Sequence, residues 1–245
     1  MLSIFNWKKP AVDQLSFLRT DIHSHLLPGI DDGSTEMEKT ISYIEALVKL
    51  GYKKFITTPH VKAGIFPNTP QIINGALAEV RETLKTRNIE IEIEAAAEYL
   101  LDEDFENILQ RKEILSFGSK RYVLIEMSFI APPPNLLQII FLLKTHGYTP
   151  VMAHPERYPY WWENLDKAEE LKGVGCLLQL NLLSLAGYYG KKTKQVAMKL
   201  LESDLIDFVG TDLHHERHLS DIQLLVKDAK IMKLLKNKAL LNEML

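Results

Sequence analysis

Short apolar segments recur along the chain, and each is followed by a stretch in which apolar positions repeat every three or four residues. The first pattern is typical of a buried β-strand, and the second is typical of an amphipathic helix that covers it. We predict strands at residues 18–23, 54–58, 90–96, 122–126, 149–153, 176–181 and 206–210. The chain therefore consists of consecutive βα units.

Helix signals support this alternation. After the first strand, Thr35 and Glu38 form a capping-box pattern, and the apolar positions that follow end near Gly51. Helical periodicity also covers about 70–86, 136–146, 164–171 and 191–202. Strands that alternate with helices form a parallel sheet, which is either closed into a barrel or open and doubly wound.

The third predicted strand differs from the others. Isoleucine and glutamate alternate strictly from residue 89 to residue 94, whereas a strand buried on both faces is apolar throughout. We expect one face of this strand to be in contact with water or near an edge of the sheet. A barrel that contains it would be distorted.

Composition narrows the class of protein. The 245 residues are 46% hydrophobic and 25% charged, with a net charge of −3, so the chain can form one large domain and has no overall basic field for nucleic acid. A single cysteine, Cys176, excludes an internal disulfide and fits a cytoplasmic location. The apolar stretches are too short to span a bilayer. We expect residues 1–17 to be a tail and 18–245 to be the domain.

Histidine and acidic residues gather at the carboxyl ends of the predicted strands. His23 and His25 point to the same side of an extended strand, so both imidazoles can reach one metal ion. In barrels of βα units these strand ends meet at one mouth, where the active site forms. We therefore predict one polynuclear metal centre from His23, His25, Asp32, His60, Glu98, Glu126, His154, Asp212 and His214.

The kinds of ligand indicate the chemistry. Imidazole and carboxylate without thiolate suit manganese, iron or zinc in an open catalytic site. Arg157 and Arg217 follow two of the strand ends, and guanidinium groups bind phosphate oxygens in pairs. We predict phosphoester hydrolysis; the alternative is that these arginines only pair with Glu156 and Glu216. His146, His215 and His218 are interpreted as helix-end or loop residues outside the site.

The ordered motifs resemble the polymerase and histidinol phosphatase (PHP) superfamily, and within it the bacterial tyrosine phosphatases of capsule and exopolysaccharide gene clusters. They lie at residues 21–33, 58–60, 97–98, 124–126, 154–157 and 211–214. The resemblance implies a distorted (β/α)₇ TIM-like barrel (PHP fold) with three divalent metal ions, manganese first, with iron or zinc as alternatives. It implies His23, His25, Glu98 and Asp212 at the first metal, Glu98, Glu126 and His154 at the second, and Asp32, His60 and His214 at the third.

The resemblance also implies an activity. The substrate would be phosphotyrosine on an autophosphorylating kinase of polysaccharide assembly, which would recruit the cytoplasmic enzyme to the inner face of the membrane. Arg157 would bind phosphate, as would Arg217 with less support, and His214 or an unliganded acid would serve as general acid if one is needed. The cysteine route is excluded because no phosphate-binding loop follows Cys176.

Two other functions stay open. One is a small-molecule phosphatase of the same superfamily, such as histidinol phosphatase, and the other is a non-catalytic scaffold that binds phosphoproteins. Aromatic residues bear on this choice, because they could grip a phosphotyrosine ring or simply pack the barrel rim. They are Phe66, Tyr158, Tyr160, Trp161 and Trp162.

Overall fold

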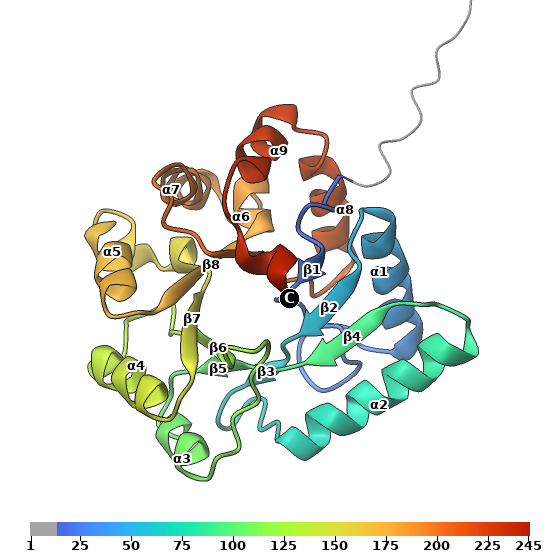
Figure 1. Cartoon of the computed structure of the whole chain (residues 1–245), viewed down its shortest axis with the longest axis horizontal. Helices are drawn as coiled ribbons and strands as arrows, with labels where there is room; N and C mark the ends of the chain where they lie inside the picture. The colour runs from blue at the N-terminus through green and yellow to red at the C-terminus, as the bar shows by residue number, and fades with distance from the viewer. Residues whose placement is uncertain (1–13) are drawn as a thin grey trace, which may run out of the picture.

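The computed structural model describes residues 14–245, in which helices surround a curled parallel sheet (Figure 1). Residues 1–13 of the predicted tail lie outside the described residues. Leu15, just after them, is fully buried, and its backbone N–H donates to the carbonyl of Leu50 at 2.8 Å. No helix among the described residues is long and apolar enough to cross a membrane.

The strands follow the predicted order, and all of them pair in parallel. Neighbouring strands are β1-β2-β4 in one sheet and β3-β5-β6-β7-β8-β9 in the other. Their bounds are β1 Thr20–Asp21, β2 Lys54–Thr57, β3 His60–Val61, β4 Glu92–Ala95, β5 Glu98–Leu100, β6 Tyr122–Glu126, β7 Thr149–Ala153, β8 Leu177–Asn181 and β9 Phe208–Gly210.

The second and third predicted units each contain two short strands in place of one. The second is divided into β2 and β3 near Pro59, which has no N–H to give to a ladder. The third is divided into β4 and β5. Hydrogen bonds continue across both breaks, from Ala96 N to Thr57 O at 2.9 Å and from Glu98 N to Pro59 O at 3.0 Å. Seven βα units therefore remain.

The segment that follows β1 pairs with the segment that follows β9. Ser24 and Leu213 form a parallel bridge, His25 N donates to Leu213 O at 3.0 Å, and Asp212 N donates to His23 O at 2.7 Å. These bonds bring the first and last strands together. The predicted α/β barrel is confirmed, in a form that the strand breaks distort.

The helices cover the outside of the barrel (Figure 1). Those predicted near residues 70, 136, 164 and 191 are confirmed, and α2 begins where Thr69 Oγ1 accepts from Ile72 N at 3.3 Å. The bounds are α1 Met37–Lys49, α2 Pro70–Thr86, α3 Phe105–Gln110, α4 Leu136–Thr145, α5 Asp166–Gly173, α6 Leu182–Ala186, α7 Lys191–Glu202, α8 Glu216–Leu225 and α9 Ala229–Lys236; the 3₁₀ turns are η1 Pro155–Arg157, η2 Pro159–Trp161 and η3 Leu241–Met244.

The C-terminal turn η3 lies against the amino ends of the barrel strands (Figure 1). Asn242 is fully buried there, and its side chain accepts from Val209 N at 3.0 Å and donates to Val209 O at 2.8 Å and to Thr20 O at 2.9 Å. One side chain thus joins the first and last strands at the end opposite the mouth.

The capping-box prediction at the start of α1 is wrong. The N-cap is Glu36, with no side-chain cap bond. Thr35 Oγ1 accepts from Lys39 Nζ at 3.0 Å, and the Glu38 carboxylate pairs with Arg87. Both side chains that would have made the box therefore have other partners.

The expectation for the third strand is confirmed. The side chains of Glu92 and Glu94 are 60% and 40% exposed, and both pair with Lys54, at 2.8 Å and 2.7 Å. Ile93 between them is buried. The strand β4 ends its three-stranded sheet, so its charged face is in contact with water.

Gly210 should not tolerate a side chain. A Cβ there would lie 2.5 Å from His23 Cβ and 2.8 Å from Gln179 Nε2, where the first and last strands meet. Gly210→Ala is expected to lower the free energy of unfolding by about 1–3 kcal/mol, the usual cost of overpacking. Gly75→Ala in α2, where a Cβ meets nothing within 4 Å, is expected to raise it by up to about 1 kcal/mol. Urea denaturation measures both, and equal stability of Gly210→Ala and the parent protein would contradict this account.

Candidate metal centre

A pocket of about 370 Å³ opens at the carboxyl ends of the strands. His23 and His25 are fully buried beside it, and the other predicted ligands line it. The structure thus brings the predicted set together. The lining residues are Asp32, His60, Lys62, Phe66, Glu98, Glu126, Phe129, His154, Arg157, Tyr189, Asp212, His214, His215 and His218.

The deepest group comprises His23, His25, Glu98 and Asp212, all buried. The two imidazole Nε2 atoms are 3.4 Å apart, and each lies 3.2–3.5 Å from Glu98 Oε2 and from Asp212 Oδ1. Donors placed about 2.1 Å from the centre of a tetrahedron have edges of about 3.4 Å. The spacing of these four atoms therefore fits one divalent metal ion.

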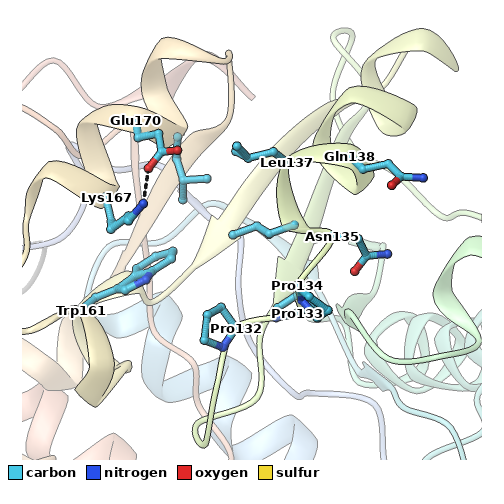
Figure 2. Close-up of a pocket in the computed structure, with 11 residues that line it drawn as sticks. Pro132, Pro133, Pro134, Asn135, Leu137, Gln138, Trp161, Lys167 and Glu170 are labelled. Carbon is cyan, nitrogen blue, oxygen red and sulfur yellow. Dashed lines mark hydrogen bonds and ion pairs between the residues drawn. The ribbon is translucent and has the colours of Figure 1, made fainter.

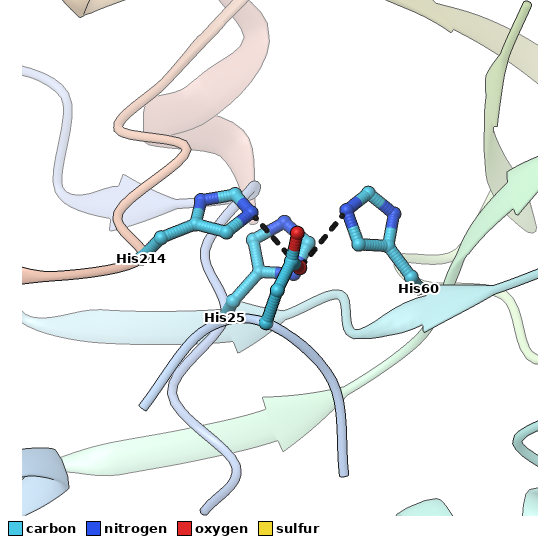
Figure 3. A group of neighbouring side chains, drawn as sticks. His25, His60 and His214 are labelled. Atoms are coloured by element: carbon cyan, nitrogen blue, oxygen red, sulfur yellow. Dashed lines mark ion pairs between the residues drawn. The ribbon is translucent and has the colours of Figure 1, made fainter. Parts of the chain in front are cut away.

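A second group lies nearer to solvent and comprises His25, Asp32, His60 and His214 (Figure 3). Asp32 Oδ1 lies 3.5 Å from His60 Nε2 and 3.6 Å from His214 Nε2. The side chain of Asp32 is 58% exposed. This group contains the three ligands that the resemblance implies for the third metal, with His25 added.

A third group comprises His60, Glu98 and Glu126. His60 Nδ1 lies 3.2 Å from Glu98 Oε2 and 3.3 Å from Glu126 Oε1. The imidazole of His60 therefore stands between these two glutamates on one side and Asp32 on the other. His154 Nε2 lies 2.9 Å from Glu98 Oε1 and 4.0 Å from Glu126 Oε2. Buried His60 Nδ1 and Glu98 Oε2 have no hydrogen-bond partner. They lie close to each other without an aligned hydrogen bond, and a metal ion would satisfy both, so these residues fit metal ions.

Hydrogen bonds orient the two deepest imidazoles. His23 Nδ1 lies 2.8 Å from Gln179 Oε1, and His25 Nδ1 lies 2.7 Å from Asp31 Oδ2, so both Nε2 atoms are free to face the metal group. Asp31 also accepts from His60 N and Gly33 N, each at 3.0 Å. Sequence analysis missed both supporting residues. A polar residue inside the apolar strand β8 was the available signal for Gln179.

The charges of this group depend on one another. Burial would lower the pKa of His23, but the carboxylates of Glu98 and Asp212 raise it to about 9. Burial would raise the pKa of Asp31, but the imidazole of His25 lowers it to about 2. Without a metal, protons on the imidazoles balance the buried carboxylates. A metal ion must displace those protons.

Two of the converging residues have left-handed backbone, which is uncommon outside glycine. The φ angles are 35° for His154 and 49° for Asp212. The neighbouring strands maintain these conformations, since His154 N donates to Gln179 Oε1 at 3.3 Å and Asp212 N donates to the backbone of His23. Strained backbone of this kind is concentrated at functional sites.

Arg157 lines the pocket and pairs with Asp212 instead of Glu156. Its Nη1 donates to Asp212 Oδ2 at 2.7 Å, and its guanidinium lies over the rings of Tyr189 at 4.1 Å and Phe129 at 4.9 Å. Glu156 accepts from the backbone of Asn181 and the hydroxyl of Ser184.

Arg217 is not brought into the pocket. Its side chain is exposed on α8, and its guanidinium lies 5.2 Å over the ring of Tyr188. Among the described residues, no ion pair joins it to Glu216. The structure therefore gives Arg217 no contact with the pocket.

His215 and His218 were wrongly placed outside the site. Both line the pocket, and His218 lies buried on α8, where its Nδ1 accepts from His214 N at 3.3 Å. Both were expected in a loop; His215 precedes the helix, but α8 begins at Glu216 and turns His218 inwards. His146 lies exposed at the end of α4.

Aromatic residues divide between the pocket and the scaffold. Phe66 lines the pocket and stacks on His60, with ring centres 5.7 Å apart. Tyr158 is fully buried, and Trp161 lines a separate cavity of about 460 Å³ beside three prolines and the Lys167–Glu170 ion pair (Figure 2). Phe129, which sequence analysis missed, is the second aromatic wall and stacks on His154.

A family model described as capsular polysaccharide synthesis, CpsB/CapC, matches residues 19–231. The tyrosine-protein phosphatase YwqE of Bacillus subtilis is 33% identical over 195 residues, which are 80% of this chain and 77% of that protein. The tyrosine-protein phosphatase CpsB of Streptococcus pneumoniae is 30% identical and covers 80% of this chain and 82% of its own.

Solved structures are also similar to this chain. The crystal structures of YwqE from Bacillus subtilis and CpsB from Streptococcus pneumoniae, described as unique metal-dependent tyrosine phosphatases, include a chain that matches with a TM-score of 0.77 and 29% identity, over 90% of this chain and 96% of that one. The lactonase Lmo2620 from Listeria monocytogenes, at 12% identity and a TM-score of 0.52 over 95% of this chain and 92% of that one, shows the fold alone.

Asp31→Asn should weaken metal binding without altering the shape of the site. The carboxylate is the partner of His25 Nδ1, and loss of such supporting acceptors costs about 10- to 100-fold in metal affinity. Asp104→Asn, at a half-buried aspartate outside the metal pocket, is the matched control. Metal content after dialysis, measured by mass spectrometry, compares the two. Equal retention by both variants would disprove the role of Asp31.

Metal loading should release protons. The pKa of His23 in the metal-free protein is about 9, so its imidazole is protonated at pH 7 and must become neutral to bind. Apparent affinity is therefore expected to rise with pH up to about 9 and then to level off. Calorimetric titrations with manganese in buffers of different ionisation enthalpy count the protons, and a count of zero at pH 7 would be inconsistent with the charge balance described here.

Proposed function

Because the chain belongs to the CpsB/CapC family of capsular polysaccharide synthesis, we propose that it is a metal-dependent protein-tyrosine phosphatase with its active site at the mouth of the barrel. One observation carries the proposal: imidazoles and carboxylates from six separate βα units meet in a pocket that also contains a fixed arginine and two aromatic walls. The domain is taken to span residues 18–245.

The residues that would hold three metal ions are those predicted from the sequence. When bound, divalent ions lower the pKa of water from about 15.7 to about 7 and neutralise phosphoryl oxygens. The donor set has no thiolate, so manganese is the first candidate, with iron and zinc as alternatives. The ligands would be His23, His25, Asp32, His60, Glu98, Glu126, His154, Asp212 and His214.

Arg157 would bind the phosphate. Burial would lower the pKa of its guanidinium, but Asp212 raises it, so the side chain stays charged. Only Nη1 is used by Asp212, and the stacked rings of Phe129 and Tyr189 limit its movement. Its remaining donors can bind two phosphate oxygens and share the charge of the transition state.

His214 suits a ligand better than a general acid. Its Nδ1 faces the carbonyl of Asp212, and its Nε2 faces Asp32. Burial and the neighbouring His25 lower its pKa to about 4, so the imidazole is neutral at pH 7 and a poor proton donor. A phenolate, with a pKa of about 10, leaves without much help from an acid.

The walls of the pocket favour an aromatic leaving group. Phe66 and Phe129 both line the pocket, beside His60 and His154 respectively, so a phenyl ring could stack between the metal group and solvent. This arrangement supports phosphotyrosine over histidinol phosphate. The converging ligands also argue against a scaffold, because binding alone does not need them.

We further propose that the phosphoprotein is an autophosphorylating tyrosine kinase of capsule or exopolysaccharide assembly. The enzyme would act in the cytoplasm and be recruited to the inner face of the membrane by that kinase. Support comes from the family description and from the similarity to YwqE and CpsB. Arg217, exposed on α8, would act only if a substrate protein reached it.

Phosphate release from a phosphotyrosine peptide should depend on added manganese and stop with chelator. His23→Ala and Asp212→Ala are each expected to lower kcat/KM at least about 100-fold, because each removes a donor from the deepest group. His146→Ala, an exposed histidine at the end of α4, is the control and should keep full activity. Circular dichroism checks folding.

The same assay with a phosphoserine peptide and histidinol phosphate decides between the candidate functions. Preference for histidinol phosphate would favour the small-molecule phosphatase. Absence of activity on all three substrates in metal-loaded protein would favour the scaffold.

A further inference from the structure

A second concave surface begins beside the metal pocket. It is a groove of about 670 Å³ between α7 and the start of α9, helices that lie close together on the outside of the barrel (Figure 1). We call it the lysine groove. Its residues are Trp162, Lys191, Lys192, Lys194, Gln195, Val196, Met198, Lys199, Glu202, Asp228, Lys230 and Ile231.

The lysine groove is positively charged, although the chain has a net charge of −3. Lys192 pairs with Glu163, but within residues 14–245 no ion pair involves the other four lysines of the groove. Of its two acids, Asp228 accepts from Lys230 N and Ile231 N at the start of α9. The surface therefore attracts anionic groups.

The lysine groove also has apolar residues between its charges. Trp162, Val196, Met198 and Ile231 contribute to its lining, and Val196 and Ile231 are buried. A hollow with apolar residues and charged edges suits a peptide segment, whereas a bilayer surface is flat. The occupant that fits is an acidic peptide with an apolar side chain.

The lysine groove starts close to the metal pocket. Tyr189 lines the pocket and Lys191 lines the groove, so their Cα atoms are at most about 7.6 Å apart. On the other wall, Trp162 Nε1 donates to the carbonyl of Glu156, the neighbour of Arg157, at 2.8 Å. A peptide held in the pocket can extend directly into the groove.

The length of the lysine groove sets the register. From Lys191 to Lys199 the helix α7 rises about 12 Å, which matches about four residues of extended peptide. The distance from Tyr189 to Lys191 adds about two residues of extended peptide. The peptide residues in the groove therefore stand at about the third to the sixth position from a phosphotyrosine in the pocket.

We propose that the lysine groove binds an acidic segment of the substrate that flanks the phosphotyrosine. This inference rests on the proposed phosphatase function, and it adds a determinant of substrate sequence outside the reacting centre. Ionic contacts with the lysines hold the acidic side chains, while the apolar lining receives the residue between them.

The test compares peptides with glutamate at the third to sixth positions before or after phosphotyrosine with peptides that carry glutamine there. The quantity is the ratio of kcat/KM for the glutamate and glutamine peptides, with manganese present. Exposed ion pairs contribute factors of about 1.4 to 5 each, so the ratio is expected to be at least about fivefold in one direction and to fall in high salt.

The groove variant is Lys191→Glu/Lys199→Glu, in which the ratio should fall to about 1 or below. The matched control, Lys53→Glu/Lys120→Glu, makes the same change of charge at exposed lysines that precede β2 and β6 and lie outside the lysine groove, and should keep the parent ratio. Because the quantity is a ratio, a general loss of activity does not affect it.

Three results would overturn the inference. A parent ratio near 1 with good activity on both peptides removes the lysine groove as a determinant but leaves the phosphatase function standing. Inactivity on every phosphotyrosine peptide removes both. Sedimentation with phosphatidylglycerol vesicles that is lost only in the groove variant, together with a ratio near 1, would assign the groove to a membrane.

Discussion

The closure of the barrel between its first and last strands is the contact on which the metal centre depends. Backbone bonds from His25 N to Leu213 O and from Asp212 N to His23 O join segments almost two hundred residues apart. They place the imidazoles of His23 and His25 within 3.3–3.4 Å of Asp212 Oδ1. Asn242 secures the same junction from the other end of the barrel. The sheet that defines the fold therefore also sets the distances in its deepest group of ligands.

The charge of this group explains why so many polar residues support it. Buried carboxylates and imidazoles are costly unless each is paired and hydrogen-bonded. Here Gln179 and Asp31 each bond one imidazole, while buried His60 Nδ1 and Glu98 Oε2 have no partner. Most polar atoms of this group are thus satisfied within the protein, and a bound cation would complete the set.

How much of this was predictable depends on the kind of signal. The seven βα units could be predicted from the periodicity of apolar residues. The convergence of His60, Glu98 and His154 could then be predicted from topology, because each residue lies at the carboxyl end of a predicted strand. Phe129 was missed because it lies in a loop after β6, which has no periodic pattern. His218 was missed because it was interpreted as a loop residue, whereas it lies on the buried face of α8 with Leu219 and Ile222. Arg157 lines the pocket, and its pairing with Asp212 was not predicted, because it is a contact between distant units.

Asp212 connects the deepest imidazoles with Arg157. Its Oδ1 faces the imidazoles of His23 and His25, and its Oδ2 accepts from Arg157 and, at 2.6 Å, from Asn181 Nδ2. One carboxylate therefore faces the deepest group of candidate ligands with one oxygen and the guanidinium of Arg157 with the other. Because its backbone is left-handed, with φ at 49°, the strand junction determines both directions together. The position of the Arg157 guanidinium relative to His23 and His25 thus depends on the closed barrel.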